Sequence, residues 1–207
     1  DELIPLGKVK DFAPYITKIK ASGAQALLTG NWGPDMNLLI KAGIDAGVDL
    51  GYYTFYAHLA GGAVAIGPGG DGKVRAVQSF NENIAPEIGN AETEKWTKDF
   101  RDKFPFDFYS AGFRTIFEYV QLAVTKAGSM DVTKIAYAME GLEHKDFLGY
   151  DSVMRKDDHQ LISEYFVGVF KKGVKYDSEK TGLGWATEAT ILAKDLMQPT
   201  TCKMKRP

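Results

Sequence analysis

Two stretches in the first third of the chain carry apolar residues at the i, i+3, i+4 and i+7 spacing that is typical of an amphipathic helix. These residues are Phe12, Tyr15, Ile16 and Ile19 in the first stretch, and Met36, Leu39, Ile40 and Gly43 in the second. Gly23 and Gly47 follow the two stretches, as glycine commonly does at a helix end. The pattern predicts a helix that Asp11 caps and a second helix that starts at Pro34 and Asp35.

Short apolar runs before, between and after these helices predict strands. The runs cover residues 3–6, 24–29, 50–55 and 74–80. Helices that alternate with strands at such short intervals indicate an α/β fold with a parallel sheet and right-handed crossovers. Residues 60–72 are rich in glycine and predict a loop around a short helical turn.

The rhythm changes after residues 81–90, which contain Pro86 and Gly89 and predict a segment that crosses to another lobe. Three aromatic residues at i, i+4 and i+8 then predict a helix that Pro105 stops. Residues 109–127 predict a longer helix, and Asp131 predicts the cap of the next one. The three aromatic residues are Trp96, Phe100 and Phe104, and the expected inward face of the longer helix carries Phe113, Ile116, Phe117 and Val120.

Two strands and an irregular tail are expected in the last third of the chain. Residues 147–154 and 161–170 predict paired strands around a polar turn. The tail from Gly182 predicts irregular structure that Trp185 and Ile191 anchor. Cys202 is the single cysteine and has no internal disulfide partner, so either a partner elsewhere or an inert thiol is expected.

Aromatic and polar side chains follow the ends of two neighbouring predicted strands. Asn31 and Trp32 come after the strand over 24–29, and Tyr56, Ala57 and His58 come after the strand over 50–55. The carboxyl ends of parallel strands meet at one edge of a sheet, where open α/β sheets bind ligands. A tryptophan in a glycine-flanked loop covers either a neighbouring segment or a ligand. The sequence therefore predicts a ligand crevice at this edge.

Charge and motif spacing exclude several other classes of function. The net charge is −2 over 207 residues without a basic cluster, which argues against a nucleic acid or an anionic membrane as a partner. The run from Gly67 to Lys73 resembles a phosphate-binding loop, but Val74 stands where that motif needs a hydroxyl. The histidines lack metal-ligand spacing, and no strained serine elbow is present. We expect no cofactor, no metal and no catalytic residue, with His58 as either scaffold or ligand contact.

Several segments, taken in order, resemble the type I periplasmic solute-binding proteins of ABC importers, of the leucine/isoleucine/valine-binding kind. They are Lys18-Ile-Lys-Ala-Ser-Gly-Ala24, Gly30-Asn-Trp-Gly-Pro-Asp-Met36, Lys41-Ala-Gly43, Thr125-Lys-Ala-Gly128, Phe166-Val-Gly-Val-Phe170 and the ending Cys202-Lys-Met-Lys-Arg-Pro207. The resemblance implies a receptor of two lobes that closes on a small solute. It also implies a periplasmic or extracellular location and a membrane permease as partner. Since Asp1 is not an initiator methionine, we expect a fragment or a processed chain.

The resemblance implies how the chain is divided between the two lobes. Residues 1–82 would be part of the carboxyl-terminal lobe, 83–165 part of the amino-terminal lobe, and 166–207 a return to the carboxyl-terminal lobe with the tail. The expected fold class is therefore α/β, with a parallel sheet flanked by helices and parts of two lobes.

The resemblance also implies which residues line the pocket. Trp32 stands where the family has a pocket aromatic, and Phe113 matches another, with Tyr109 nearby. Tyr56 stands where the family has an acidic residue for the ligand's ammonium group. The neutral phenol leaves open either a branched-chain amino acid or an aromatic carboxylate as the solute. Two alternatives to a solute-binding receptor remain: a small α/β enzyme and a ligand-sensing domain of a signalling protein.

Overall fold

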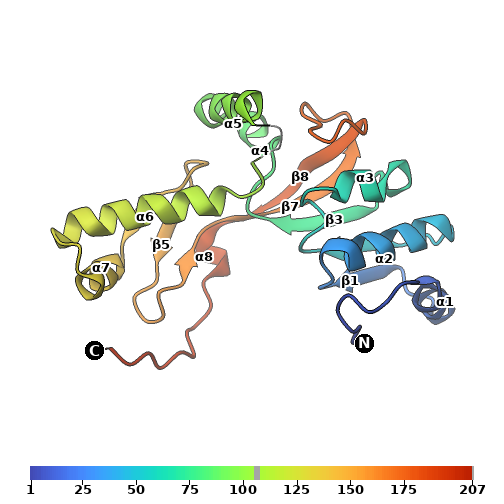
Figure 1. Cartoon of the computed structure of the whole chain (residues 1–207), viewed down its shortest axis with the longest axis horizontal. Helices are drawn as coiled ribbons and strands as arrows, with labels where there is room; N and C mark the ends of the chain where they lie inside the picture. The colour runs from blue at the N-terminus through green and yellow to red at the C-terminus, as the bar shows by residue number, and fades with distance from the viewer. Residues whose placement is uncertain (105–107, 207) are drawn as a thin grey trace.

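The computed structural model describes residues 1–104 and 108–206, which form two sheets flanked by helices (Figure 1). The helices are α1 (Ala13–Ser22), α2 (Gly33–Asp45), α3 (Gly62–Ile66), the 3-10 turn η1 (Pro68–Gly70), α4 (Ile84–Glu87), α5 (Ala91–Lys103), α6 (Ala111–Ala127), α7 (Val132–Met139) and α8 (Ala193–Leu196). The strands are β1 (Ala26–Thr29), β2 (Gly51–Thr54), β3 (Val74–Gln78), β4 (Glu143–Lys145), β5 (Asp151–Met154), β6 (Leu161–Ile162), β7 (Tyr165–Lys172) and β8 (Leu183–Ile191).

The larger sheet has the strand order β1-β2-β3-β7-β8. β1, β2 and β3 run parallel, whereas β7 runs antiparallel to both β3 and β8. The alternation of helix and strand up to β3 confirms the predicted α/β arrangement. The expected apolar stripes of α1 and α2 pack into one core with Tyr52 of β2, and Ile40 and Tyr52 are fully buried there.

The ends of α1 follow from local chemistry. Gly23 adopts the left-handed conformation at φ 71°, and its N–H donates to the carbonyl oxygen of Lys20, which closes the helix as predicted. Asp11 Oδ1 accepts the N–H of Ala13 at 2.9 Å, although the residue at the cap position is Phe12. The predicted cap, Asp11, is therefore one residue before the observed cap position, Phe12.

The predicted strand over residues 3–6 is wrong. These residues are in no strand, and Leu3 is 94% exposed. Pro5 has no N–H for a strand ladder, and the Asp35 carboxylate accepts the N–H of Gly7 at 2.7 Å, which holds the segment as a turn beside α2.

The smaller sheet is antiparallel and has the order β4-β5-β6. It lies beside α6 and α7 at the opposite end of the molecule from α1 and α2 (Figure 1). Asp131 caps α7 as predicted, since its Oδ1 accepts the N–H of Lys134. The expected pairing of two late strands holds for β5 and β6 only. Residues 147–149 form a turn instead, because Asp146 Oδ1 accepts the amides of Leu148 and Tyr150.

The expected inward face of α6 is wrong. Its large apolar residues are exposed, and a face of mostly small residues is buried instead, with Tyr119 Oη at 2.9 Å from Ser152 Oγ of β5. The exposed residues are Phe113, Ile116, Phe117 and Val120 at 68%, 48%, 73% and 39%, and the buried ones are Ala111, Thr115, Tyr119 and Ala123. Hydrophobicity alone does not show which face of a helix packs against a neighbouring element. In α6 the packed face is the one that carries Tyr119, whose hydroxyl group reaches Ser152.

The tail from Gly182 also differs from its prediction. Residues 183–191 form β8, which pairs with β7 along its length with one register shift between Val167 and Gly168. The sequence of β8 lacks the alternation of buried and exposed residues that predicts a strand. Its first residues are all buried, and its later residues are half-buried or exposed. Trp185 anchors the segment as expected and is 8% exposed.

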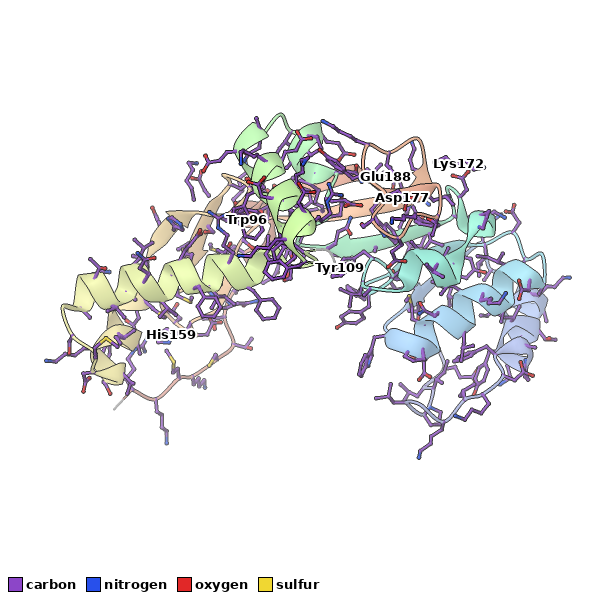
Figure 2. The ribbon with its side chains drawn as sticks, turned by 45° about the horizontal axis from the view of Figure 1, so that its top comes forward. Trp96, Tyr109, His159, Lys172, Asp177 and Glu188 are labelled. Carbon is purple, nitrogen blue, oxygen red and sulfur yellow. The ribbon has the colours of Figure 1, made fainter. Side chains whose placement is uncertain are left out.

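The aromatic stripe of α5 is confirmed. Trp96 and Phe100 stack with ring centroids 5.6 Å apart, and Trp96 also meets Phe108 edge to face. Figure 2 shows Trp96 directed towards the start of α6. Pro105, the expected stop, lies outside the described residues.

Candidate functional site

The carboxyl ends of β1 and β2 lie side by side. Thr29 is the register partner of Thr54, so the loops that leave the two strands start from the same edge of the sheet. The loop after β1 carries Asn31 and Trp32, and the loop after β2 carries Tyr56, Ala57 and His58. The two predicted strand-end segments therefore leave the sheet at one edge.

The loop after β1 presents Trp32 to the surface. Thr29 Oγ1 accepts the N–H of Asn31 at 3.1 Å, which turns the chain away from the strand. Trp32 then takes an extended conformation just before α2, and Gly33 follows with φ 56°, a value that favours glycine. The Trp32 side chain is 54% exposed, whereas Asn31 is half-buried. A large ring held in the open at a strand end is available to a ligand.

The loop after β2 is pinned by Thr54. Its Oγ1 donates to the carbonyl oxygen of Arg75 at 2.9 Å and accepts the N–H of Ala57 at 3.3 Å. Tyr56 is 42% exposed at this turn, whereas Ala57 is fully buried in the core. Ala57 thus packs in the core cluster in this structure, whereas its neighbour Tyr56 is exposed.

His58 and Tyr109 meet in a small recess, although they come from distant parts of the sequence. The recess has a volume of about 30 Å³, and Figure 2 shows Tyr109 at the start of α6. Its walls also include Phe80, Asn81, Glu82, Phe108, Ser178 and Trp185. Burial lowers the pKa of His58 to about 4, so the imidazole is neutral at pH 7.

Asn81 and Trp185 are wall residues of this recess that the sequence reasoning did not place at the site. Asn81 follows β3, whose carboxyl end lies at the same edge of the sheet as those of β1 and β2. The prediction of a third parallel strand could therefore have placed Asn81 at the site. Trp185 offered no signal, because β8 joins the sheet from the far end of the chain. Its ring meets His58 edge to face at 6.5 Å between centroids.

The charge of the recess wall is balanced. Glu82 Oε2 accepts a hydrogen bond from Arg101 Nη1 at 2.5 Å, and Glu82 Oε1 accepts the hydroxyl of Ser178 at 2.6 Å. The Arg101 guanidinium in turn lies over the ring of Tyr176 at 4.3 Å. The one carboxylate of the wall is thereby neutralised by a neighbouring cation.

Five of the seven predicted site residues stand apart from the recess, and Phe113 is one of them. It lies on the exposed face of α6, at 68% exposure, and it is not among the recess walls. Trp32, Tyr56 and Phe113 are thus three exposed rings outside the recess, and His58 and Tyr109 are the two predicted residues that line it.

Other chemistries find little support in the described part of the chain. Across residues 1–104 and 108–206, no three histidine, cysteine or carboxylate side chains gather where they would hold a metal ion. The strand β3 follows directly on residues 67–73, where a phosphate-binding loop needs a helix. In the same residues, every helix is too short or too polar to cross a lipid bilayer.

A curated relative aligns with nearly the whole of this chain. The Leu/Ile/Val-binding protein homolog 4 of Brucella abortus is 28% identical over 207 aligned residues, which cover 98% of this chain and 49% of that protein. The chain therefore spans about half the length of this relative.

Two solved structures are similar over most of the chain. The leucine-, isoleucine-, valine-, threonine- and alanine-binding protein of Brucella ovis, in a closed conformation, matches with a TM-score of 0.87 and 26% identity, over 99% of this chain and 53% of that one. The fold is also that of an ABC transporter solute-binding protein from Rhodopseudomonas palustris in complex with 3,4-dihydroxybenzoic acid, with a TM-score of 0.67 and 15% identity, over 88% and 49%. The model of the periplasmic binding protein family matches residues 1–175, and the chain belongs to that family.

Proposed function

We propose that this chain forms part of a solute receptor of an ABC importer and that it binds a branched-chain amino acid or a related small carboxylate. The observation that carries the proposal is the shared edge of β1 and β2, where the loops that leave the two strands carry the exposed rings of Trp32 and Tyr56. The Leu/Ile/Val-binding relatives and the amino-acid-binding protein of Brucella ovis support the class of solute.

The proposed mechanism is burial without covalent chemistry. An apolar solute body packs against the rings of Trp32, Tyr56 and Phe113, and a few oriented polar groups, among them Asn31 and Tyr109, decide which solute fits. Closure of two lobes over the solute would remove those half-exposed rings from water. Each ring buried in this way adds to the affinity, so the closed state is favoured only when a solute is present.

The runner-up solute is an aromatic acid, and Tyr56 is the observation that favours it. Tyr56 is a neutral residue at a position where the resemblance expects an acidic partner for an ammonium group. A buried ammonium without a carboxylate partner is costly, whereas a benzoate-like solute has no ammonium to satisfy. Its ring would pack against Trp32 and Tyr56 in an offset or edge-to-face arrangement.

The remaining parts of the proposal concern location and partners. Membership in the periplasmic binding protein family supports a periplasmic or extracellular receptor that delivers its solute to a membrane permease. An enzyme or a sensing domain of a signalling protein are the competing classes. The family consists of solute-binding receptors, which favours transport over catalysis.

The test is a titration of the full gene product by calorimetry with leucine, isoleucine, valine, benzoate and 4-hydroxybenzoate. Saturable binding of one of these solutes without turnover is the expected result. Recovery of a chemically altered solute from the mixture would overturn the receptor proposal in favour of an enzyme. Tight binding of an aromatic acid with no binding of the aliphatic amino acids would replace the first solute class by the second.

A further inference from the structure

Two of the residues that line the recess of His58 and Tyr109 each have a buried polar atom that lacks a partner among the described residues. These atoms are His58 Nδ1 and Asn81 Nδ2. Buried polar atoms in folded proteins are nearly always paired, so two such atoms in one recess call for a ligand group or an ordered water. We propose that the recess receives a hydroxyl group of the solute, with His58 and Asn81 as the residues that select it. This inference rests on the proposed function.

The hydrogen-bonding capacities of the two residues complement each other. Asn81 Oδ1 accepts the N–H of Asn83 at 2.9 Å, which fixes the orientation of the amide and leaves Nδ2 as a donor. His58 is neutral, since burial lowers its pKa to about 4, and a neutral imidazole with its proton on Nε2 accepts at Nδ1. A hydroxyl group donates one hydrogen bond and accepts others, so it satisfies both residues at once.

Charged groups fit the recess poorly. Glu82 is the carboxylate of the wall, and its oxygens already accept from Arg101 and Ser178, so an ammonium group finds no free negative partner. The neutral His58 offers no positive charge to a carboxylate. Burying an ion without a counter-charge costs far more than burying a hydroxyl group that makes its hydrogen bonds. The recess therefore selects a neutral polar group.

The size of the recess matches one hydroxyl group. Its volume is about 30 Å³, above the roughly 10 to 15 Å³ that a cavity needs to hold one water molecule. The surrounding walls are rings, among them Phe80, Phe108 and Trp185, which suit an apolar solute body behind the hydroxyl. A solute of the same shape without the hydroxyl would leave both polar atoms buried and unpaired.

The experiment compares matched solutes on the full gene product by calorimetry: valine with threonine, phenylalanine with tyrosine, and benzoate with 4-hydroxybenzoate. In at least one pair, the hydroxyl-bearing member should bind tighter by about tenfold or more, because the analogue strands two buried groups. His58→Leu should abolish that preference. His58→Asn should retain part of it, since the asparagine amide places a polar atom at the level of Nδ1.

Each variant carries its own check on folding. A thermal melting curve like that of the parent chain, together with retained binding of the hydroxyl-free member of the pair, shows that His58→Leu is folded. His144→Leu is the matched control, because His144 is also partly buried but lies outside the recess and faces Glu118. It should leave the hydroxyl preference as it is.

Two results would overturn the inference while the proposed function stands. One is a protein that binds leucine or benzoate but shows no tighter binding of threonine, tyrosine or 4-hydroxybenzoate than of their partners. The other is a hydroxyl preference that survives in His58→Leu, which would assign the recess to a structural water. Failure to bind any of these solutes instead overturns the proposed function, and this inference with it.

Discussion

His58 and Trp185 meet edge to face, with ring centroids 6.5 Å apart and ring planes at 89°. Trp185 also packs on Phe170 of β7 at 5.3 Å, so it ties the antiparallel side of the larger sheet to the loop that leaves β2. The recess therefore depends on a strand from the far end of the chain. A tryptophan signal in a titration has more than one source, because Trp185 lines the recess, Trp96 packs on the recess wall residue Phe108, and Trp32 is half-exposed at the end of β1.

Trp32→Ala should weaken solute binding by roughly 2 to 4 kcal/mol, the range of an aromatic residue at the centre of an interface. The physical reason is that a ring which is 54% exposed without solute loses that water contact when a solute packs on it. Calorimetric titration of the full gene product measures the change. Trp32→Phe is the matched control and should keep most of the affinity, because it retains a ring. An unchanged affinity in Trp32→Ala would assign the ring a structural role.

Gly62→Ala should disturb the loop that carries Tyr56 and His58. A Cβ atom on Gly62 would lie 2.0 Å from the carbonyl oxygen of Ala57, and the next nearest atoms are also backbone atoms of Ala57, so no side chain can move aside. We expect a loss of about 1 to 3 kcal/mol in the free energy of unfolding and weaker solute binding. Urea unfolding and calorimetry measure the two effects.

Gly112→Ala is the control for that variant. Its Cβ atom would meet only Ser110 Oγ, at an ordinary 3.6 Å, in the first turn of α6. Alanine is the better helix former, so stability should be unchanged or rise by up to about 1 kcal/mol. Equal losses in the free energy of unfolding of the two variants would contradict the claim that the contact with Ala57 destabilises Gly62→Ala.

Glu164, which lies between β6 and β7, makes the stability of the fold depend on pH. Its side chain is buried, and burial, with the hydrogen bond and charge of Asp146, raises the pKa of Glu164 to about 9. The folded state therefore keeps a proton that the unfolded state releases from about pH 4.5 upward. Stability from this group is fully present below pH 4.5 and is lost as the pH rises towards 9, by at most about 1.4 kcal/mol per pH unit.

Glu164→Gln tests this linkage, because glutamine keeps the shape and cannot ionise. The free energies of unfolding of the variant and the parent are measured in urea at pH 5, 7 and 9. The value for the variant, relative to that of the parent, should increase as the pH rises. Asp151→Asn is the matched control, since Asp151 is exposed and pairs with Lys145 at the surface. Parallel pH profiles for Glu164→Gln and the parent chain would refute the linkage.

The sequence was most informative where a pattern is local. Gly23 ends α1 and Asp131 caps α7, because a positive φ or a side-chain acceptor is decided within a few residues. The two strand ends could be predicted for the same reason, since they depend on the period of short apolar runs. These local signals suffice for the parallel half of the larger sheet.

Long-range partners explain what the sequence analysis missed. The apolar stripe of α6 does not say which face meets β5, and that choice depends on Tyr119 reaching Ser152. Trp185 enters the recess only because β8 belongs to the same sheet as β3. A residue whose role depends on strand order is invisible to periodicity.

Tyr52 and Gly43 offer a test of packing in the core. The Tyr52 hydroxyl is buried without a partner among the described residues, and a Cβ atom on Gly43 would lie 1.9 Å from it. Gly43→Ala should therefore be destabilising by about 1 to 3 kcal/mol, in spite of the better helix propensity of alanine. Tyr52→Phe removes an unpaired hydroxyl and should leave stability unchanged or raise it by up to about 1 kcal/mol.

The double variant decides whether the hydroxyl is the obstacle. With the oxygen gone, the nearest ring atom is Cζ at 3.0 Å, a contact that a small shift of α2 can relieve. The free energies of unfolding of the two single variants and the double variant should then be non-additive by about 1 kcal/mol or more, with the double variant more stable than the sum predicts. Additive values would mean that Gly43 is required by Ile16, whose Cδ1 lies 3.3 Å from the same position, and not by Tyr52.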